Sequence, residues 1–302
     1  MTPSILCSVC AIVVSFQPER ELLRENLSII SKQVNAVILV DNASSVSPES
    51  LIQDENILFV RLEENSGIAF ALNVGISMAR ERGFEYVIFF DQDSAPLNEC
   101  IGKLFASYNI LEAEGRKVAA VGPRFRDPVN NVISDPLGYS LWGTRALQCD
   151  NAATIPVDFL VSSGSLLRIH TIDVVGPMRE DLFIDHVDTE WILRAQHYGY
   201  RAYCRCDAEM LHSLGEKRRR VWFFRWRNVP FHSSFRYYYI FRNSLLVMRQ
   251  KDIPLKWKFM EFCRIFKVAT FMLIYSEERG EFLRYIFLGY IHGVIGVTGK
   301  LR

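Results

Sequence analysis

Residues 86–93 read Tyr86-Val87-Ile88-Phe89-Phe90-Asp91-Gln92-Asp93, an apolar run that ends in two carboxylates. A continuous apolar run of this length is typical of a strand buried on both faces of a parallel sheet. In open sheets of this kind, ligands bind beyond the carboxyl ends of the strands. The stretch therefore predicts a central strand from Tyr86 to Phe90, with Asp91 and Asp93 at the functional edge.

The residues before this strand alternate between strand-like and helical patterns. Strands are predicted at 11–15, 36–40 and 57–61, and helices at 19–33 and 69–82. This order predicts a doubly wound α/β domain, with a Rossmann-like, mostly parallel sheet and flanking helices. No G-x-G-x-x-G motif follows Val14 and no P-loop motif occurs, which argues against nicotinamide and P-loop phosphate sites.

Composition and charge divide the chain into two parts. Its 302 residues are 49% hydrophobic and 23% charged, which excludes disordered and collagen-like classes. The net charge of +1 conceals a split: 17 Lys and Arg against 28 Asp and Glu in residues 1–213, but 18 against 6 in residues 214–302. We therefore expect a sheet domain over 1–213 and a basic, aromatic-rich helical extension over 214–302.

The seven cysteines include a C-x-x-C pair, Cys7 and Cys10, and a C-x-C pair, Cys204 and Cys206. Their spacing does not match known zinc modules, so buried free thiols in a reducing, cytosolic compartment are expected instead. No apolar run approaches the roughly 20 residues that a membrane-spanning helix needs.

Asp91 and Asp93 are placed so that both can reach one hard cation, while a nucleotide diphosphate supplies further oxygens. The structural alternative is that Asp93 caps a helix beginning near Leu97. Asp41 and Asn42 follow another apolar run, and Ser15 follows a third. The Asp41 carboxylate can accept the imide N–H of a uracil or thymine ring, or it can form an Asx-type turn.

A further acidic cluster spans residues 182–194. If the chain is helical from Thr189, Asp188 lies at the helix start, either as an ionised base or as an N-cap. Glu190 and Arg194 are four residues apart, which predicts an ion pair on this helix.

The order of these motifs resembles glycosyltransferase family 2, and within it the bacterial rhamnosyltransferases of O-antigen and cell-wall polysaccharide assembly. The motifs are 41–44 (Asp-Asn-Ala-Ser), 64–67 (Glu-Asn-Ser-Gly), 73–75 (Asn-Val-Gly), 91–93 (Asp-Gln-Asp), 162–165 (Ser-Ser-Gly-Ser), 185–194 and 236–243. The likeness spans about residues 10–245.

The resemblance implies a GT-A fold, a nucleotide-sugar donor such as dTDP-rhamnose, a divalent cation (Mg²⁺ or Mn²⁺) and inversion at the anomeric carbon. Alignment on Arg194 puts the family's base at Asp188, with Asp185 as alternate because Val187 replaces the usual Glu. The donor would be bound by Ser15, Asp41, Asn42, Asn65, Gly67, Asn73, Asp91, Gln92 and Asp93. The metal would be held by Asp91 and Asp93, with His212 near the diphosphate unless it is structural. The acceptor side would include Ser163, Gly164, Glu190 and Trp191.

The last 89 residues contain 20 of the 38 aromatic residues. Basic residues interleaved with aromatic ones suit an anionic membrane surface, single-stranded nucleic acid, or in part a packed core. The resemblance favours a peripheral position on the cytoplasmic face of the bacterial inner membrane, a polyprenyl-diphosphate-linked saccharide as acceptor, and no nucleic-acid partner. The alternative function is a nucleic-acid-binding protein that uses this cationic tail.

Overall fold

The computed structural model describes residues 8–128, 131–140, 143–149, 153–212, 218–223, 225–230, 233–275 and 279–301; for 212, 218–223 and 225–230 it describes the backbone alone. The strands are β1 (Val9–Ser15), β2 (Ala36–Asp41), β3 (Ile57–Arg61), β4 (Tyr86–Asp91), β5 (Ser94–Pro96), β6 (Val118–Arg126), β7 (Leu137–Ser140), β8 (Gly143–Ala146), β9 (Thr154–Val157), β10 (Leu166–Arg168), β11 (Arg201–His212), β12 (Arg218–Phe223) and β13 (Arg225–Pro230). The α-helices are α1 (Arg20–Ser31), α2 (Ile68–Glu81), α3 (Cys100–Ala113), α4 (Ile169–Val175), α5 (Val187–His197), α6 (Ser234–Met248), α7 (Leu255–Tyr275) and α8 (Arg279–Ile295), with short 3₁₀ turns at Glu49–Leu51 and Glu180–Leu182.

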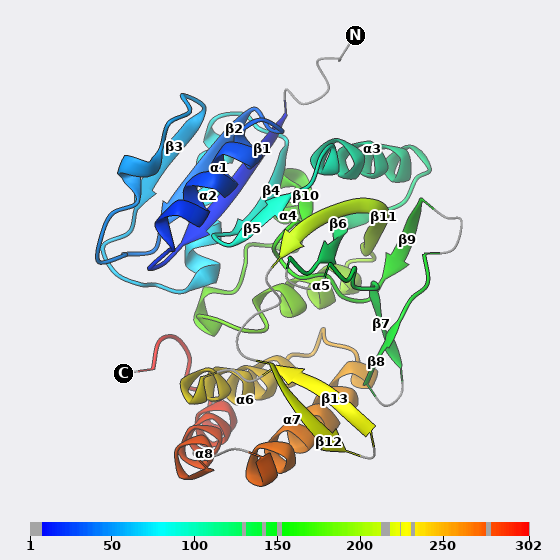
Figure 1. Ribbon diagram of the computed structural model, residues 1–302. Helices are drawn as coiled ribbons and strands as arrows, with labels where there is room; N and C mark the ends of the chain where they lie inside the picture. The colour runs from blue at the N-terminus through cyan, green and yellow to red at the C-terminus, as the bar shows by residue number, and fades with distance from the viewer. Residues whose placement is uncertain are drawn as a thin grey trace.

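One large sheet forms the centre of the molecule in the order β3-β2-β1-β4-β10-β6-β11-β5 (Figure 1). Its first four strands are parallel neighbours, and β6 and β11 are also parallel. The short strand β10 is antiparallel to both β4 and β6 and joins the two parallel halves. The predicted α/β class, with a mostly parallel sheet and flanking helices, is confirmed.

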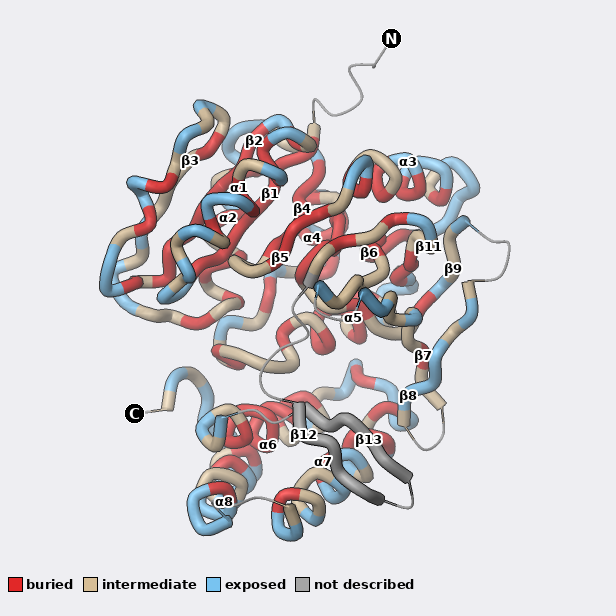
Figure 2. The backbone as a smooth tube through the Cα atoms, in the orientation of Figure 1, coloured by how far each residue is buried: buried red, intermediate tan, exposed pale blue. Residues whose placement is uncertain are grey.

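The sheet is buried on both faces, as the apolar strands predict (Figure 2). Along β1, Cys10, Ile12 and Val14 belong to one core cluster, which also contains residues of α2, α4 and α5. The alternate residues belong to a second cluster with residues of α1 and α3. Each large side chain buried in this way contributes about 1.5–3 kcal/mol. Close packing also requires glycine at position 75 in α2, because a Cβ there would lie 2.4 Å from Cγ2 of Ile12.

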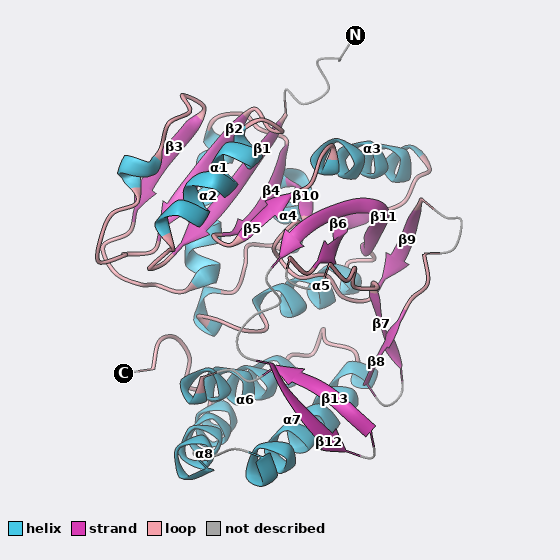
Figure 3. Ribbon diagram, in the orientation of Figure 1, coloured by secondary structure: helices cyan, strands magenta, loops and turns pink. Residues whose placement is uncertain are grey.

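The C-terminal part is helical only from α6 onward (Figure 3). The predicted helical extension is confirmed over α6, α7 and α8, and it is preceded by β12 and β13, which form an antiparallel pair with Trp222 opposite Trp226. Aromatic and β-branched residues favour strands, and this preference prevails in the stretch. The helices that follow share a small core of their own, which includes Tyr237, Phe241, Ile265 and Phe282.

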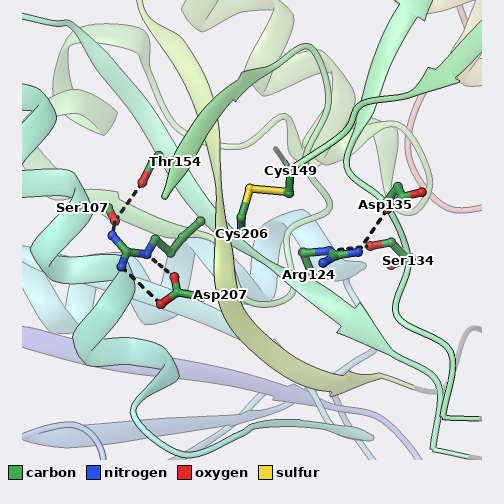
Figure 4. Close-up of a disulfide and its surroundings, with 9 residues drawn as sticks. Ser107, Arg124, Ser134, Asp135, Cys149, Thr154, Cys206 and Asp207 are labelled. Carbon is green, nitrogen blue, oxygen red and sulfur yellow. Dashed lines mark hydrogen bonds and ion pairs between the residues drawn. A yellow bond between two sulfur atoms is a disulfide. The ribbon is translucent and has the colours of Figure 1, made fainter. Parts of the chain in front are cut away.

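Cys149 and Cys206 form a disulfide, with their Cα atoms 5.7 Å apart (Figure 4). The bond joins the segment before β9 to β11, and it corrects the expectation that all cysteines are unpaired. Because the two residues are 57 positions apart, their spacing gave no sign of the pairing. Cys10, Cys100 and Cys204 are buried free thiols, as expected, and Cys7 lies outside the described residues. Disulfides are rare in the cytosol, so the cysteines no longer support a reducing compartment.

Candidate active site

The sheet brings three predicted strand ends to one edge. Ser15 at the end of β1 is in register with Asp41 at the end of β2, and Asp91 at the end of β4 is in register with Val14. Parallel pairing places these carboxyl ends side by side, as expected for a ligand edge.

Asp41 forms the Asx-type turn, which was the alternative to binding the imide N–H of a uracil or thymine ring. Its side chain is fully buried, and its carboxylate accepts hydrogen bonds from the Ser44 hydroxyl (2.5 Å), the Ser44 N–H and, at 3.4 Å, the Ser15 hydroxyl. Arg61 lies 3.6 Å away through Nε, and its Nη2 donates to the Ser44 carbonyl. Asp41 therefore organises the turn at the end of β2 in this conformation.

Two amide side chains hold the loop that precedes α2. Asn42 Nδ2 donates to Asn65 Oδ1 (3.2 Å), and Asn42 Oδ1 accepts the N–H of Ser66 (3.0 Å). Gly67 has a φ of 89°, and a Cβ there would lie 2.4 Å from the carbonyl oxygen of Phe183. The predicted donor-side residues Asn42 and Asn65 are therefore joined by hydrogen bonds between the end of β2 and the loop before α2. Glycine is needed at position 67, where that loop contacts Phe183.

Gln92 lies between Asp91 and Asp93 and connects β4 to its neighbours. Its side-chain oxygen accepts the N–H of Phe16 (2.7 Å), and its carbonyl accepts a hydrogen bond from Asn26 (3.1 Å). These contacts fix the backbone between the two carboxylates.

Asp93 does not cap the following helix. Residues Ser94–Pro96 form β5, and α3 begins only at Cys100 after Glu99. Asp91 and Asp93 are both partly exposed at the strand end, and carboxylate oxygens are the ligands that Mg²⁺ and Mn²⁺ prefer. Among the side chains that the structure describes, no three His, Cys, Asp or Glu residues gather into a metal cage. A cation bound here would need further oxygens from a ligand.

His212 ends β11, and its backbone pairs with Ser94, the residue after Asp93. Its side chain lies outside the described part of the structure, so its predicted metal role stays a prediction.

The segment 162–165 connects the Asp91 strand end to the next part of the site. The Asp91 N–H donates to Ser163 Oγ (3.1 Å), and the Gly164 N–H donates to the Phe89 carbonyl (2.7 Å). Gly164 has a φ of 79°, and a Cβ would lie 2.4 Å from Sδ of Met210. Ser163 and Gly164, predicted on the acceptor side, thus lie directly beside the carboxylates.

Asp188 lies at the other side of this segment. It lines a small cavity of about 20 Å³ together with Ser162, Ser165, Phe89 and Trp191. Burial raises its pKa, against the opposing effects of the Thr189 N–H hydrogen bond (2.6 Å) and the His186 charge. A carboxylate with a raised pKa beside a ligand edge has the properties of a general base.

Helix α5 is held by the ion pair predicted between Glu190 and Arg194, which is confirmed at 3.0 Å. Glu190 is fully buried, and Arg194 also donates to the carbonyls of Val175 and Pro177. Trp191 is 1% exposed and donates through Nε1 to Gly176 O (2.9 Å). Glu190 and Trp191 therefore fix the helix rather than present polar groups to an acceptor.

Asn73, predicted on the donor side, also has a structural role. Its side-chain amide donates to Met178 O (2.9 Å) and Glu180 Oε1 (2.8 Å), and its oxygen accepts the Met178 N–H. It connects α2 to the segment that leads toward Asp188.

The turn before α5 contains contacts that sequence reasoning missed. Phe183, Asp185 and His186 all have φ values near +64°, which costs on the order of 1–3 kcal/mol each for residues other than glycine. Side chains of α6 and α7 hold this turn: Arg236 binds Asp185, Asn243 donates to three of its carbonyls, and Glu261 lies 3.2 Å from His186. Only the run from Arg236 to Asn243, which belongs to the resemblance, signalled any of them.

Known proteins share the sequence family and the fold of this chain. A model of glycosyl transferase family 2 matches residues 10–171. The chain is 31% identical over 303 residues to the dTDP-rhamnosyl transferase RfbF of Shigella flexneri, with 98% of each chain covered.

Solved structures share the fold. TarS residues 1–349 of S. aureus, in complex with UDP-GlcNAc, has a TM-score of 0.61 and 15% identity, over 95% of this chain and 81% of that one. GalNAc-T7, solved with UDP, GalNAc and Mn²⁺, has a TM-score of 0.57 and 11% identity, over 68% of this chain and 43% of that one. The match of family, full-length relative and fold leads to one conclusion: this chain belongs to glycosyl transferase family 2 and is a glycosyltransferase with a GT-A fold.

Proposed function

We propose that this glycosyltransferase moves L-rhamnose from dTDP-β-L-rhamnose to a saccharide acceptor carried on a polyprenyl diphosphate. The donor is supported by one observation above all, the similarity to a dTDP-rhamnosyl transferase over 98% of both chains. The family membership also favours this function over the nucleic-acid-binding alternative.

In the proposed reaction, Asp188 accepts the proton of an acceptor hydroxyl. The acceptor oxygen forms a bond to the anomeric carbon as the bond from that carbon to the diphosphate oxygen breaks, so that dTDP leaves and the configuration inverts. The position of Asp188 beside the segment 162–165 supports this role, because the same segment is bound to Asp91. Starting from a β-linked donor, the product would be an α-rhamnoside.

Asp91 and Asp93 would hold Mg²⁺ or Mn²⁺ against the donor diphosphate, with the ends of β1 and β2 near the nucleoside. When bound, the cation supplies positive charge that stabilises the leaving diphosphate. The GalNAc-T7 structure, which contains Mn²⁺ and UDP, has the same fold and is in line with this proposal. The protein's own contribution is the fixed backbone around Gln92, which keeps both carboxylates at the edge.

We also place the enzyme at the cytoplasmic face of the inner membrane in O-antigen or related polysaccharide synthesis, where the Cys149–Cys206 bond would be transient, as cytosolic disulfides usually are. No helix in the part of the chain that the structure describes is both long and apolar enough to span a bilayer. Instead, α7 exposes Phe259, Phe262 and Phe266, and α8 exposes Phe287 and Ile295. Exposed apolar residues on neighbouring helices suit contact with a membrane surface.

The test is transfer of labelled rhamnose from dTDP-rhamnose to a lipid-linked acceptor fraction, with UDP-glucose as the competing donor and EDTA to remove the metal. The proposal expects metal-dependent product from dTDP-rhamnose alone. Product from UDP-glucose would support a glycosyltransferase but contradict rhamnose as the transferred sugar. Transfer that resists EDTA would contradict the metal dependence.

A further inference from the structure

The turn that carries the proposed base is bound on one side by the C-terminal helices. Asn243 Nδ2 donates to the carbonyls of Leu182, Ile184 and Asp185 at 2.6–2.9 Å, and both Asn243 and its neighbour Arg242 are fully buried. A buried amide that binds three carbonyls of one turn specifies the path of that turn.

The His186 side chain contacts both α6 and α7. Its Nε2 lies 3.1 Å from Ser244 Oγ and 3.2 Å from Glu261 Oε1. The Ser244 hydroxyl donates to the same Glu261 oxygen at 2.5 Å, and Trp257 packs edge-on against the His186 ring.

Glu261 is a charged group in a nearly closed environment, with 5% of its surface exposed. Burial alone would raise its pKa, but His186 and the Arg264 guanidinium outweigh burial and hold the pKa well below its usual range. Arg264 binds both carboxylate oxygens, at 2.7 Å from Nε and 2.5 Å from Nη2. Glu261 therefore stays ionised and is fully bound by its neighbours.

The backbone of His186 leads directly to the base. The His186 carbonyl accepts the N–H of Glu190, which makes it the first acceptor of helix α5. His186 has a φ of 64°, so the direction in which α5 starts depends on holding this residue in an unfavourable conformation. Asp188, two residues later, takes its orientation from that start.

We infer that Glu261 is a positioning residue: through His186 it fixes the start of α5 and thereby the orientation of Asp188. The inference rests on the proposed role of Asp188 as base. It assigns the C-terminal helices a part in catalysis that is separate from any membrane contact.

The test is Glu261→Gln, which keeps the size of the side chain and removes its charge. The matched control is Glu281→Gln in α8, where the exposed carboxylate accepts a hydrogen bond from Ser234 and is not among the groups holding the turn. We expect Glu261→Gln to lower kcat on the order of tenfold with donor KM within twofold, because a displaced base loses rate rather than donor affinity. The control should leave both constants unchanged.

A second readout is independent of activity. Hydrogen exchange in peptides covering residues 182–190 should become faster in Glu261→Gln, while peptides of β4 exchange as in the wild type. Ser244→Ala, which removes the hydroxyl between His186 and Glu261, should show the same two effects more weakly and serves if Glu261→Gln does not fold.

Unchanged exchange in 182–190, or an unchanged kcat per folded molecule, would overturn the inference. Comparison of the two single variants Asp188→Asn and Glu261→Gln separates this failure from failure of the proposed function. If Asp188→Asn leaves turnover intact, Asp188 is not the base; if it abolishes turnover while Glu261→Gln does not lower kcat, only the positioning role fails.

Discussion

The Arg236 guanidinium binds the Asp185 carboxylate through two nitrogens, with 3.0 Å from Nη2 to Oδ1 and 3.2 Å from Nε to Oδ2. This ion pair separates the two carboxylates that compete for the role of base. Asp185 is engaged with α6, whereas Asp188 lines the cavity beside Ser162 and Ser165. The resemblance favours Asp188 with Asp185 as the alternate, and the geometry favours Asp188 as well.

Replacing Asp188 with Asn should lower kcat by about 10³-fold, because general base catalysis typically contributes 10²–10⁴-fold. Donor binding, measured by calorimetry with dTDP-rhamnose and Mn²⁺, should stay close to that of the wild type. Asp185→Asn should lower kcat far less, by on the order of tenfold through a looser turn, and lose roughly 1–2 kcal/mol of stability with its Arg236 contact. The opposite pattern, with turnover abolished only in Asp185→Asn, would reverse the assignment.

The half-buried position of Asp188 also predicts a link between pH, activity and stability. Burial raises its folded-state pKa, so the acid limb of kcat/KM should lie above the ordinary Asp value of about 3.9. Because the folded protein prefers the protonated form, stability is lost as the pH rises through that raised pKa. Asp188→Asn should therefore raise the Tm at pH 7.5, and the gain should shrink near pH 4. A Tm gain that is equal at both pH values would contradict the linkage.

The sequence was sufficient to predict the parallel strands and the strand ends, because long apolar runs and the residues after them obey local rules. Ser15, Asp41 and Asp91 were placed at one edge by those rules alone, and the register confirms it. The same rules do not show in which direction a carboxylate points. The Asp41 carboxylate points into the turn after β2, because Ser44 donates a hydrogen bond to it and Arg61 lies beside it.

Contacts between distant segments were beyond prediction from spacing. Glu261 follows His186 by 75 positions in the sequence, and nothing in a helical pattern distinguishes it from a surface glutamate. Cys149 and Cys206 were missed for the same reason. Such contacts depend on the way that whole helices and loops pack, which one sequence does not display.

The carboxylates at the end of β4 predict a metal-dependent donor site. Asp93→Asn should weaken the binding of dTDP-rhamnose in the presence of Mn²⁺ by on the order of tenfold or more, because it removes one charged oxygen ligand. Without Mn²⁺ the variant and the wild type should bind equally weakly. Glu55→Gln, an exposed residue just before β3 at the opposite edge of the sheet, is the control. Equal loss in both variants, or no loss in either, would argue against the metal site.

The disulfide predicts a redox-dependent stability. It closes a loop of 57 residues, for which the chain-entropy model gives roughly 4 kcal/mol. Cys149→Ser and reduction of the wild type should each lower the Tm by several degrees, and reduction should have no further effect on the variant. Cys263→Ser, which removes a free thiol of α7, should leave the redox dependence intact. A Tm that does not respond to reduction would show that the bond does not form in solution.

The exposed face of α7 predicts binding to anionic membranes. Phe262 and Phe266 are 60% and 68% exposed, one helical turn apart, with the cation of Lys267 on the same helix. Phe262→Glu with Phe266→Glu should remove most flotation with phosphatidylglycerol vesicles, because it deletes inserted rings and adds charge that the lipid repels. Ile110→Glu, at a residue of α3 that is 55% exposed, controls for the loss of any surface hydrophobe. Turnover of a water-soluble acceptor should survive in the double variant, since Glu261 belongs to the buried face of the helix. If flotation persists in that variant and falls in Ile110→Glu, then the membrane contacts a different face of the enzyme.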